Sequence, residues 1–254
     1  MRLRLDATAI DVRHRSRSGE AVVEVTYERH GRLHRVQARN VIMASGAWIN
    51  RRILSDAPAD ISRSLAAFQH APVLVANVAL SNWRFLERAG ITACLWHEGD
   101  FGFQCNIRRP LEEGRYAPPL HPDKPIFLTF YVPFPRPGLP TAAQLALGRQ
   151  DLMGTSFSDF ELLVRKQMTD LFAPFGFDAR RDIAGLILNR WGHAYIVPEP
   201  GFYFGREGQP PARERLREHG YGRIRFAHSE LTGHQAYETA LQESARAVSQ
   251  VLSA

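Results

Sequence analysis

Apolar and polar residues alternate in three separate runs near the start of the chain. Apolar side chains at every second position place one face of a strand on a core and the other in solvent. Turn-like segments containing Ser, Gly and His separate the runs, so the pattern predicts three antiparallel strands in a β-meander. The three runs cover residues 2–12, 21–29 and 33–38.

A short run that is apolar throughout follows the meander. It begins at Asn40-Val41 and ends at the small residues Ser45-Gly46. An uninterrupted apolar run indicates a strand buried on both faces, and small residues at its end leave room for a ligand. Ser45 and Gly46 are therefore candidate ligand-binding residues.

The middle of the chain alternates strand-like runs with loops and has no regular strand–helix–strand rhythm. A short helix is expected at 82–88, closed by Gly90, and the proline-rich segment 133–140 ends the last of these strands. The missing rhythm favours an antiparallel sheet with peripheral helices. The expected strands cover residues 73–80, 91–96, 101–107 and 126–134.

The clearest amphipathic helix begins at Ser158 and ends near Phe172. Ser158 and Glu161 have the spacing of a capping box, in which each side chain bonds a free backbone amide of the first turn. Pro174 and Gly176 then stop the helix. We interpret this helix as structural.

A buried strand at 183–188 runs out into a segment rich in aromatic and basic residues. Trp191, His193 and Tyr195 lie in this segment. The end of a strand is where α/β proteins place ligands, so the three are candidates for a binding site. Two alternatives remain: the aromatic residues close a domain interface, and His193 is a hydrogen-bonded structural histidine.

The C-terminal segment predicts a strand, a turn and a helix. The strand covers 223–227, the turn 228–235, and the helix begins at Ala236, with apolar residues at helical spacing on its buried side. Free amides and the helix dipole at such a turn attract anionic or electron-rich ligands. Glu230 lies in the turn and is either a ligand-binding group or an exposed carboxylate.

Composition narrows the class of protein. The 254 residues are 44% hydrophobic, enough for one large or two small domains. Thirty-two basic against 26 acidic residues give a net charge of +6. The basic residues are nearly all arginine and are dispersed, without a nucleic-acid-binding signature, so we expect a solvated surface and no nucleic-acid partner.

Cysteine usage and hydropathy favour a cytoplasmic protein. Cys94 and Cys105 form no CxxC motif, so reduced thiols are expected. The acidic turn 97–100 lacks further ligands, and no metal site is predicted. No apolar run reaches the ~18 residues of a membrane span, and the early first strand leaves no room for a signal peptide.

The C-terminal residues resemble the flavin motif of the FAD-dependent amine oxidases. In that family a strand ending in Phe-Ala-Gly-Glu/Asp precedes a turn and a helix that faces the pyrimidine side of the isoalloxazine. Phe226-Ala227 matches the motif, His228 stands at the family's glycine, and Glu230 comes one position late. The resemblance implies that Glu230 accepts a hydrogen bond from a ribityl hydroxyl and that Gly233 belongs to the cofactor-facing turn.

A longer ordered set of residues resembles bacterial spermidine dehydrogenases and related flavin-dependent amine oxidoreductases. With the C-terminal motif it covers roughly 125–252, and the meander extends it loosely to residue 1. In such flavoproteins the strand after the meander lies beside the cofactor, which implies cofactor contacts for Ser45 and Gly46. The set comprises Pro135–Leu139, Gln144, Gly148-Arg149, Phe157, Phe160-Glu161, Gln167, Gly176–Asp178, Asp182-Ile183 and Asn189–Tyr195.

The resemblance also implies roles for the aromatic segment. Trp191 and Tyr195 would form a wall that holds an amine by cation–π contact, and His193 would be the catalytic candidate. The family begins with a strand and Gly-x-Gly-x-x-Gly, which carries the ADP half of FAD. That motif is absent from this sequence, so the chain is expected to correspond to the C-terminal portion of such a flavoprotein.

The expected fold is α/β: a partial two-dinucleotide-fold flavoprotein without its N-terminal Rossmann βαβ unit, with an inserted antiparallel-sheet substrate domain. The retained parts of the FAD-binding domain would be residues 1–55 and 186–254, and the substrate domain 56–185.

The implied parent oxidises an amine or polyamine by hydride transfer to FAD. This chain alone is expected to be inactive and to bind FAD weakly or not at all. Its expected partners are a small-molecule amine and a missing N-terminal chain. Two alternatives stay open: a non-catalytic remnant or partner subunit that completes a flavoprotein fold, and an arginine-rich phosphate or nucleic-acid binder.

Overall fold

The computed structural model describes residues 3–99, 101–108 and 111–253, and these divide into two compact units. The first unit joins Met1–Gln69 to Tyr195–Ala254, and the second is His70–Ala194. The units thus change at 69/70 and 194/195, whereas the sequence placed domain boundaries at 55/56 and 185/186. Each unit has a hydrophobic core of its own.

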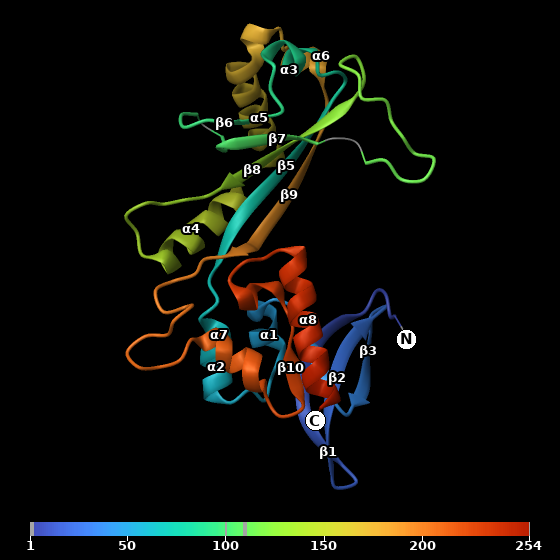
Figure 1. Ribbon diagram of the computed structural model, residues 1–254, viewed down its shortest axis with the longest axis vertical. Helices are drawn as coiled ribbons and strands as arrows, with labels where there is room; N and C mark the ends of the chain where they lie inside the picture. Colours follow the sequence, from blue (N-terminus) through green and yellow to red (C-terminus); the bar gives the residue numbers. More distant parts are fainter. Residues whose placement is uncertain (1–2, 100, 109–110, 254) are drawn as a thin grey trace. The chain divides into compact units, whose positions relative to one another are not determined.

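A three-stranded antiparallel meander opens the first unit (Figure 1). Both hairpins use two-residue turns in which both residues have positive φ, Ser18-Gly19 and His30-Gly31. Turns of that type match the right-handed twist of the flanking strands. The strands are β1 (Thr8–Arg17), β2 (Glu20–Arg29) and β3 (Arg32–Ala38).

The first strand is shifted along the chain from its predicted place at 2–12. It begins at Thr8, which pairs with Glu28 almost at the end of β2, so residues 3–7 have no partner strand to extend the ladder. At its other end β1 continues to Arg17, because only two residues are needed for the turn.

The centre of the first unit is a pair of parallel strands, β4 (Val41–Met43) and β10 (Ile224–Phe226). In this pair Met43 lies opposite Phe226, and both side chains are buried. The sequence predicted a strand at both positions, the first from an uninterrupted apolar run, and the structure confirms these two strands.

Helices surround the parallel pair and complete the core of the first unit. Apolar side chains from the meander, the pair and these helices form one buried cluster that includes Val23, Leu65, Leu216 and Phe226. The helices are α1 (Ala47–Ile53), α2 (Ala59–Ala66), α7 (Ala212–Glu214), the π-helical turn η2 (Arg215–His219), the 3₁₀ turn η3 (Ser229–Thr232) and α8 (Tyr237–Leu252).

Helix α8 begins one residue after its predicted start. Of the predicted apolar face, only the small residues and one valine are buried or half-buried: Ala236, Ala240, Ala247 and Val251. Leu241, Val248 and Leu252 were expected in the core and are exposed. The buried residues are Ala247 and Glu243, because small and charged side chains rather than large apolar ones face β10 and η2.

The second unit is built on a five-stranded sheet in the order β6-β7-β8-β5-β9 (Figure 1). The β6–β7, β7–β8 and β8–β5 pairs are antiparallel, as the sequence predicted. The strands are β5 (His70–Leu80), β6 (Ala93–Leu95), β7 (Gln104–Arg108), β8 (Ile126–Pro133) and β9 (Ile183–Ile196).

One face of this sheet packs on helices. Leu74, Leu128 and Phe130 from the sheet meet Phe160 and Met168 of α5 in the buried cluster of the second unit. The helices are α3 (Arg84–Ala89), α4 (Thr141–Gly154), α5 (Phe157–Phe172), the 3₁₀ turn η1 (Ala173–Phe175) and α6 (Ala179–Asp182).

Two predictions for the second unit need correction. The N-cap of α5 is Ser156, whose hydroxyl accepts the Asp159 amide at 3.1 Å, and Ser158 lies within the first turn. The strand expected at 183–188 continues to Ile196, because as β9 it pairs with the long strand β5 at the edge of the sheet. The short helix closed by Gly90 is confirmed.

Candidate functional site

The ends of the two parallel strands bring together three of the predicted cofactor-binding residues. Ser45 and Gly46 follow β4, and Glu230 follows β10 four residues after Phe226. Because the strands run in the same direction, both of these connections leave the sheet at the carboxyl ends of the strands. This is where α/β folds place ligands.

The Glu230 carboxylate is buried at these strand ends. The residue is 1% exposed, and Oε1 accepts a hydrogen bond from the amide of Ala47, the first residue of α1. His228 Nδ1 lies 3.6 Å from the same oxygen and accepts the amide of Glu230 at 3.2 Å. The carboxylate is therefore held in place and is not the exposed turn residue that the sequence left open.

Gly46 lies against the Trp48 ring and beside Glu230. A Cβ at this position would lie 3.3 Å from Trp48 Cδ1 and 3.6 Å from Glu230 Oε1. Its φ of −60° is accessible to any residue, so the only constraint on a side chain here is the tight contact that its Cβ would make with the Trp48 ring.

Ser45 is fixed by a residue that the sequence did not single out. Asn50 on α1 accepts the Ser45 hydroxyl at 2.5 Å and donates to the Ser45 carbonyl at 2.8 Å. The Asn50 side chain is buried, so this reciprocal pair orients the turn between β4 and α1. The sequence did not point to Asn50, because helix α1, which carries it, was not predicted.

Gly233 has a packing role in the structure. Its φ is +79°, and a Cβ would meet the ring of Tyr203, whose hydroxyl donates to the Gly233 carbonyl at 3.2 Å. Its amide closes η3 on the Glu230 carbonyl at 2.9 Å. Gly233 therefore positions the turn that carries Glu230, and the Tyr203 ring lies directly on it.

The substrate-binding candidates belong to β9. Arg190 and Gly192 face the helices: Arg190 bonds the carbonyls of Leu152 and Met153, and a Cβ on Gly192 would touch Met153. Trp191 and His193 alternate with them and so lie on the other face of the strand. Trp191 is 56% exposed, and the His193 ring lies 5.8 Å from the buried His70 ring, edge to face.

Tyr195 occupies the next alternate position of β9 and is the first residue of the returning segment of the first unit. Its side chain is 48% exposed. The cofactor candidates thus lie in the first unit together with Tyr195, and Trp191 and His193 lie in the second.

The sheet of the second unit carries a polar network on the face turned away from α5, which we call the distal sheet face. Thr129 donates to Asn77 Oδ1 at 2.8 Å and accepts from Arg108 Nε at 3.1 Å. Arg108 also donates to the Tyr131 hydroxyl at 3.0 Å. The sequence missed this network, because only the register of β5, β7 and β8 aligns these side chains.

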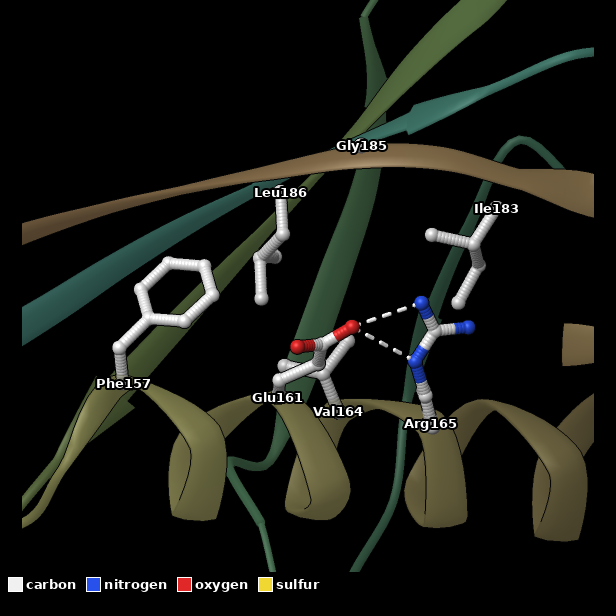
Figure 2. Close-up of a pocket in the computed structure, with 7 residues that line it drawn as sticks. All are labelled: Phe157, Glu161, Val164, Arg165, Ile183, Gly185 and Leu186. Carbon is white, nitrogen blue, oxygen red and sulfur yellow. Dashed lines mark hydrogen bonds and ion pairs between the residues drawn. The ribbon is translucent and has the colours of Figure 1, made fainter. Parts of the chain in front are cut away.

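A small pocket lies between α5 and β9 in the second unit (Figure 2). Its volume is about 70 Å³, and Val164, Ile183 and Leu186 supply apolar walls. Glu161 points into it, but one of its carboxylate oxygens accepts both Nε and Nη2 of Arg165, at 2.9 and 2.7 Å. None of the predicted site residues lines this pocket, and its carboxylate already has a counter-ion.

Metal binding and membrane insertion find no support in the described part of the chain. Among the described residues no three His, Cys, Asp or Glu side chains gather as metal ligands. Within the same residues, no helix combines the length and apolar character needed to cross a bilayer.

Comparison with known proteins places the fold among amine oxidases. The chain matches a putrescine oxidase variant with a TM-score of 0.64 at 14% identity, over 98% of this chain and 49% of that one. It matches cyclohexylamine oxidase from Brevibacterium oxydans with a TM-score of 0.63 at 12% identity, over 96% and 47%. It also matches wild-type putrescine oxidase bound to putrescine with a TM-score of 0.62 at 14% identity, over 98% of this chain and 49% of that one.

Sequence comparisons add nothing to this likeness. No family model matches the chain. No curated protein matches it either. At 12–14% identity the likeness concerns the fold, and the chain spans about half the length of the structures that it matches. The chain is therefore a mixed α/β protein with the fold of about half of an amine oxidase.

Proposed function

We propose that this chain is one half of a flavin-dependent amine oxidoreductase. Ser45, Gly46 and Glu230 would face the isoalloxazine side of FAD, and Trp191 and Tyr195 would hold the amine. The observation that carries the proposal is the buried Glu230 carboxylate, bonded to the Ala47 amide beside Gly46 where two parallel strands end. The amine oxidase fold and the Phe226-Ala227 motif support it.

The residues at these strand ends suit a flavin. Gly46 keeps the backbone free of a side chain, and Glu230 supplies a fixed acceptor for a sugar or ribityl hydroxyl. His228 replaces the glycine of the motif, and its ring folds back onto the Glu230 amide. When bound, FAD would accept a hydride from the carbon next to the amine nitrogen.

The chain's own residues would then bind and orient the substrate. Trp191 and Tyr195 offer exposed aromatic faces to an ammonium group, which such faces attract by about 0.5–2 kcal/mol. His193, beside His70, would hold or accept a proton near them. A polyamine of the spermidine type is the proposed substrate, on the strength of the ordered residues around Asn189–Tyr195.

The other half of the enzyme would supply the binding site for the ADP part of FAD. The matched structures are about twice as long as this chain, and the sequence contains no Gly-x-Gly-x-x-Gly. Pyrophosphate contacts at a helix N-terminus normally anchor a dinucleotide. We therefore expect weak FAD binding and no turnover from this chain without the complementary half.

Flavin titration tests this proposal. The fluorescence of FAD should be quenched when it is added to the purified chain, and the FAD should dissociate on gel filtration. Glu230→Ala should raise the Kd for FAD by about tenfold, which corresponds to the free energy of one hydrogen bond to a charged group. Glu207→Ala is the matched control, because Glu207 is an exposed glutamate of the same unit. Equal affinities in both variants would refute the role of Glu230, and a stoichiometric yellow protein after gel filtration would refute the need for a second half.

A further inference from the structure

The two cysteines of the chain face each other across neighbouring strands. Cys94 of β6 pairs with Cys105 of β7, and their sulfur atoms are 3.2 Å apart. The sequence offered no reason to connect these two residues, which are eleven positions apart and belong to no thiol motif. Both are free thiols in the structure.

The backbone at this pair suits a disulfide. The Trp96 amide donates to the Phe103 carbonyl, and the Ile107 amide donates to the Thr92 carbonyl. The pairs Trp96–Phe103 and Thr92–Ile107 are therefore hydrogen-bonded pairs of the antiparallel ladder. Such pairs alternate with non-hydrogen-bonded ones, so Cys94–Cys105, which lies midway between them, is also a hydrogen-bonded pair. Hydrogen-bonded antiparallel pairs have Cα atoms about 5.5 Å apart, within the roughly 4.4–6.8 Å that a disulfide spans. A sulfur–sulfur bond of about 2.05 Å therefore needs only side-chain rotation.

The two thiols differ in access and in acidity. Cys105 is 2% exposed, whereas Cys94 on the edge strand is partly exposed. The hydrogen bond between them lowers the pKa of Cys94 and, with burial, raises the pKa of Cys105. Cys94 thus has the accessible and more readily ionised sulfur, and Cys105 is placed behind it.

We propose that Cys94 and Cys105 form a site of reversible oxidation, at which hydrogen peroxide converts the two thiols to an intramolecular disulfide. The Cys94 thiolate attacks one peroxide oxygen, becomes a sulfenic acid and releases hydroxide, which takes up the proton lost from Cys94. The Cys105 sulfur then attacks the Cys94 sulfur, forms the S–S bond and releases water. Two thiols and one peroxide yield one disulfide and two waters.

This site is independent of the proposed flavin chemistry. It lies entirely within the second unit, on the strands at one edge of the sheet. The bond would close a loop from β6 to β7 and fix the edge strand, so oxidation should raise the melting temperature of the chain.

The test uses the full chain, reduced and then treated with hydrogen peroxide. After quenching with an alkylating agent, mass spectrometry should show the loss of both alkylation sites, a mass lower by two hydrogens, and a linked peptide pair containing Cys94 and Cys105. The product should stay monomeric on a non-reducing gel, and a dithiol should restore both thiols. Two thiols that remain alkylatable, or disulfide-linked dimers in place of the internal link, would overturn the proposal.

Two single variants separate the roles of the sulfurs. Cys105→Ser should leave a sulfenic acid on Cys94 that a dimedone probe labels. Cys94→Ser should slow oxidation of Cys105 at least tenfold, because the buried thiol has lost its exposed partner. Equal oxidation rates of the two remaining thiols would contradict the assigned order, and Cys105→Ala provides the same measurement if the serine variant does not fold.

Discussion

Buried charges in this molecule are held by several partners each, and Glu243 is the clearest case. Its side chain is 1% exposed, yet Oε1 binds Arg217 at 3.0 Å and Oε2 binds Arg246 at 2.7–2.8 Å. Arg246 continues to the carbonyls of Phe226 and Arg217, so one carboxylate ties α8 to β10 and η2. Removing it would take away the carboxylate that pairs with the part-buried Arg246, whereas Arg217 would keep its ion pair with Glu214.

Glu243→Ala should therefore lower the free energy of unfolding by about 3 kcal/mol, the cost of breaking a buried ion pair. Urea denaturation monitored by circular dichroism measures the effect. Leu241→Ala on the same helix is the control, since Leu241 is exposed and should change stability by less than about 0.5 kcal/mol. Equal losses in the two variants would contradict the structural role of Glu243.

Asp182 couples stability to acid pH. Burial alone would raise the pKa of its carboxyl group, but hydrogen bonds from Arg181, the Asp178 amide and Asn82 outweigh burial and lower the pKa to about 2. The unfolded value is 3.8, so the ionised group stabilises the fold fully above pH 4, and this stabilisation is lost as the pH falls from about 4 to about 2.

We expect the free energy of unfolding to fall by about 2 kcal/mol across this acid range because of Asp182. Chemical denaturation at a series of pH values measures it. Asp182→Asn should be less stable at pH 7 and should show a flatter dependence between pH 4 and pH 2. A variant whose pH profile parallels that of the wild type would show that Asp182 does not titrate in this window.

At the scale of elements, the sequence predicted those whose pattern is local. Alternation located the meander, and Gly90 marked the end of α3. Helix α4 was missed because its apolar residues lie on all sides of the helix, so they show no helical period. The start of α5 was misplaced because Ser156 and Ser158 both stand three residues before an acid, and only the folded chain shows which hydroxyl caps the helix.

The two serines at this start allow a matched test. Ser156→Ala should lower the free energy of unfolding by about 1 kcal/mol, because the hydroxyl accepts the Asp159 amide. Ser158→Ala lies in the first turn of α5 and should leave stability unchanged or slightly raised, since alanine favours helix. Thermal or urea unfolding of the two variants decides between the two positions, and a larger loss in Ser158→Ala would restore the predicted cap.

Sites formed by distant segments could be predicted only in part. The ends of two apolar strands identified Ser45, Gly46 and Glu230 as candidates, but the hydrogen bond that holds Glu230 comes from Ala47, 183 positions away in the sequence. The network of Asn77, Arg108 and Thr129 depends on the register of three strands, which alternation alone does not define.

The parallel pair β4–β10 has two lateral edges. The backbone groups along the β10 edge are hydrogen-bonded, and those along the β4 edge are open to a further strand. The outer edge of β10 is closed by Tyr221, which bonds both backbone groups of Ile224, and by Arg246 on the Phe226 carbonyl. Val41 and Met43 bond β10, so the amide and carbonyl of Ile42 point the other way. Among the described residues, no hydrogen bond outside the pair involves those two groups.

An open edge of this kind favours self-association, and Ile42→Pro should reduce it. Proline removes the amide that points outward and spares the bonds to β10. Light scattering over a range of concentrations should show less association than in the wild type, with an unchanged circular dichroism spectrum. Arg225→Pro is the control, because the Arg225 amide faces β4 and its loss should destabilise the fold instead. Unchanged association in Ile42→Pro would show that this edge is not the contact.

The open edge of β4 also determines the side on which a further strand can pair with the sheet. A strand can be added beside Ile42 but not beside Ile224, so the β4–β10 pair can be extended on one side only. In the two-part enzyme proposed above, the complementary half would therefore add its strand on the β4 side of the pair. The same property makes the first unit a scaffold for selecting foreign strands that complete the sheet.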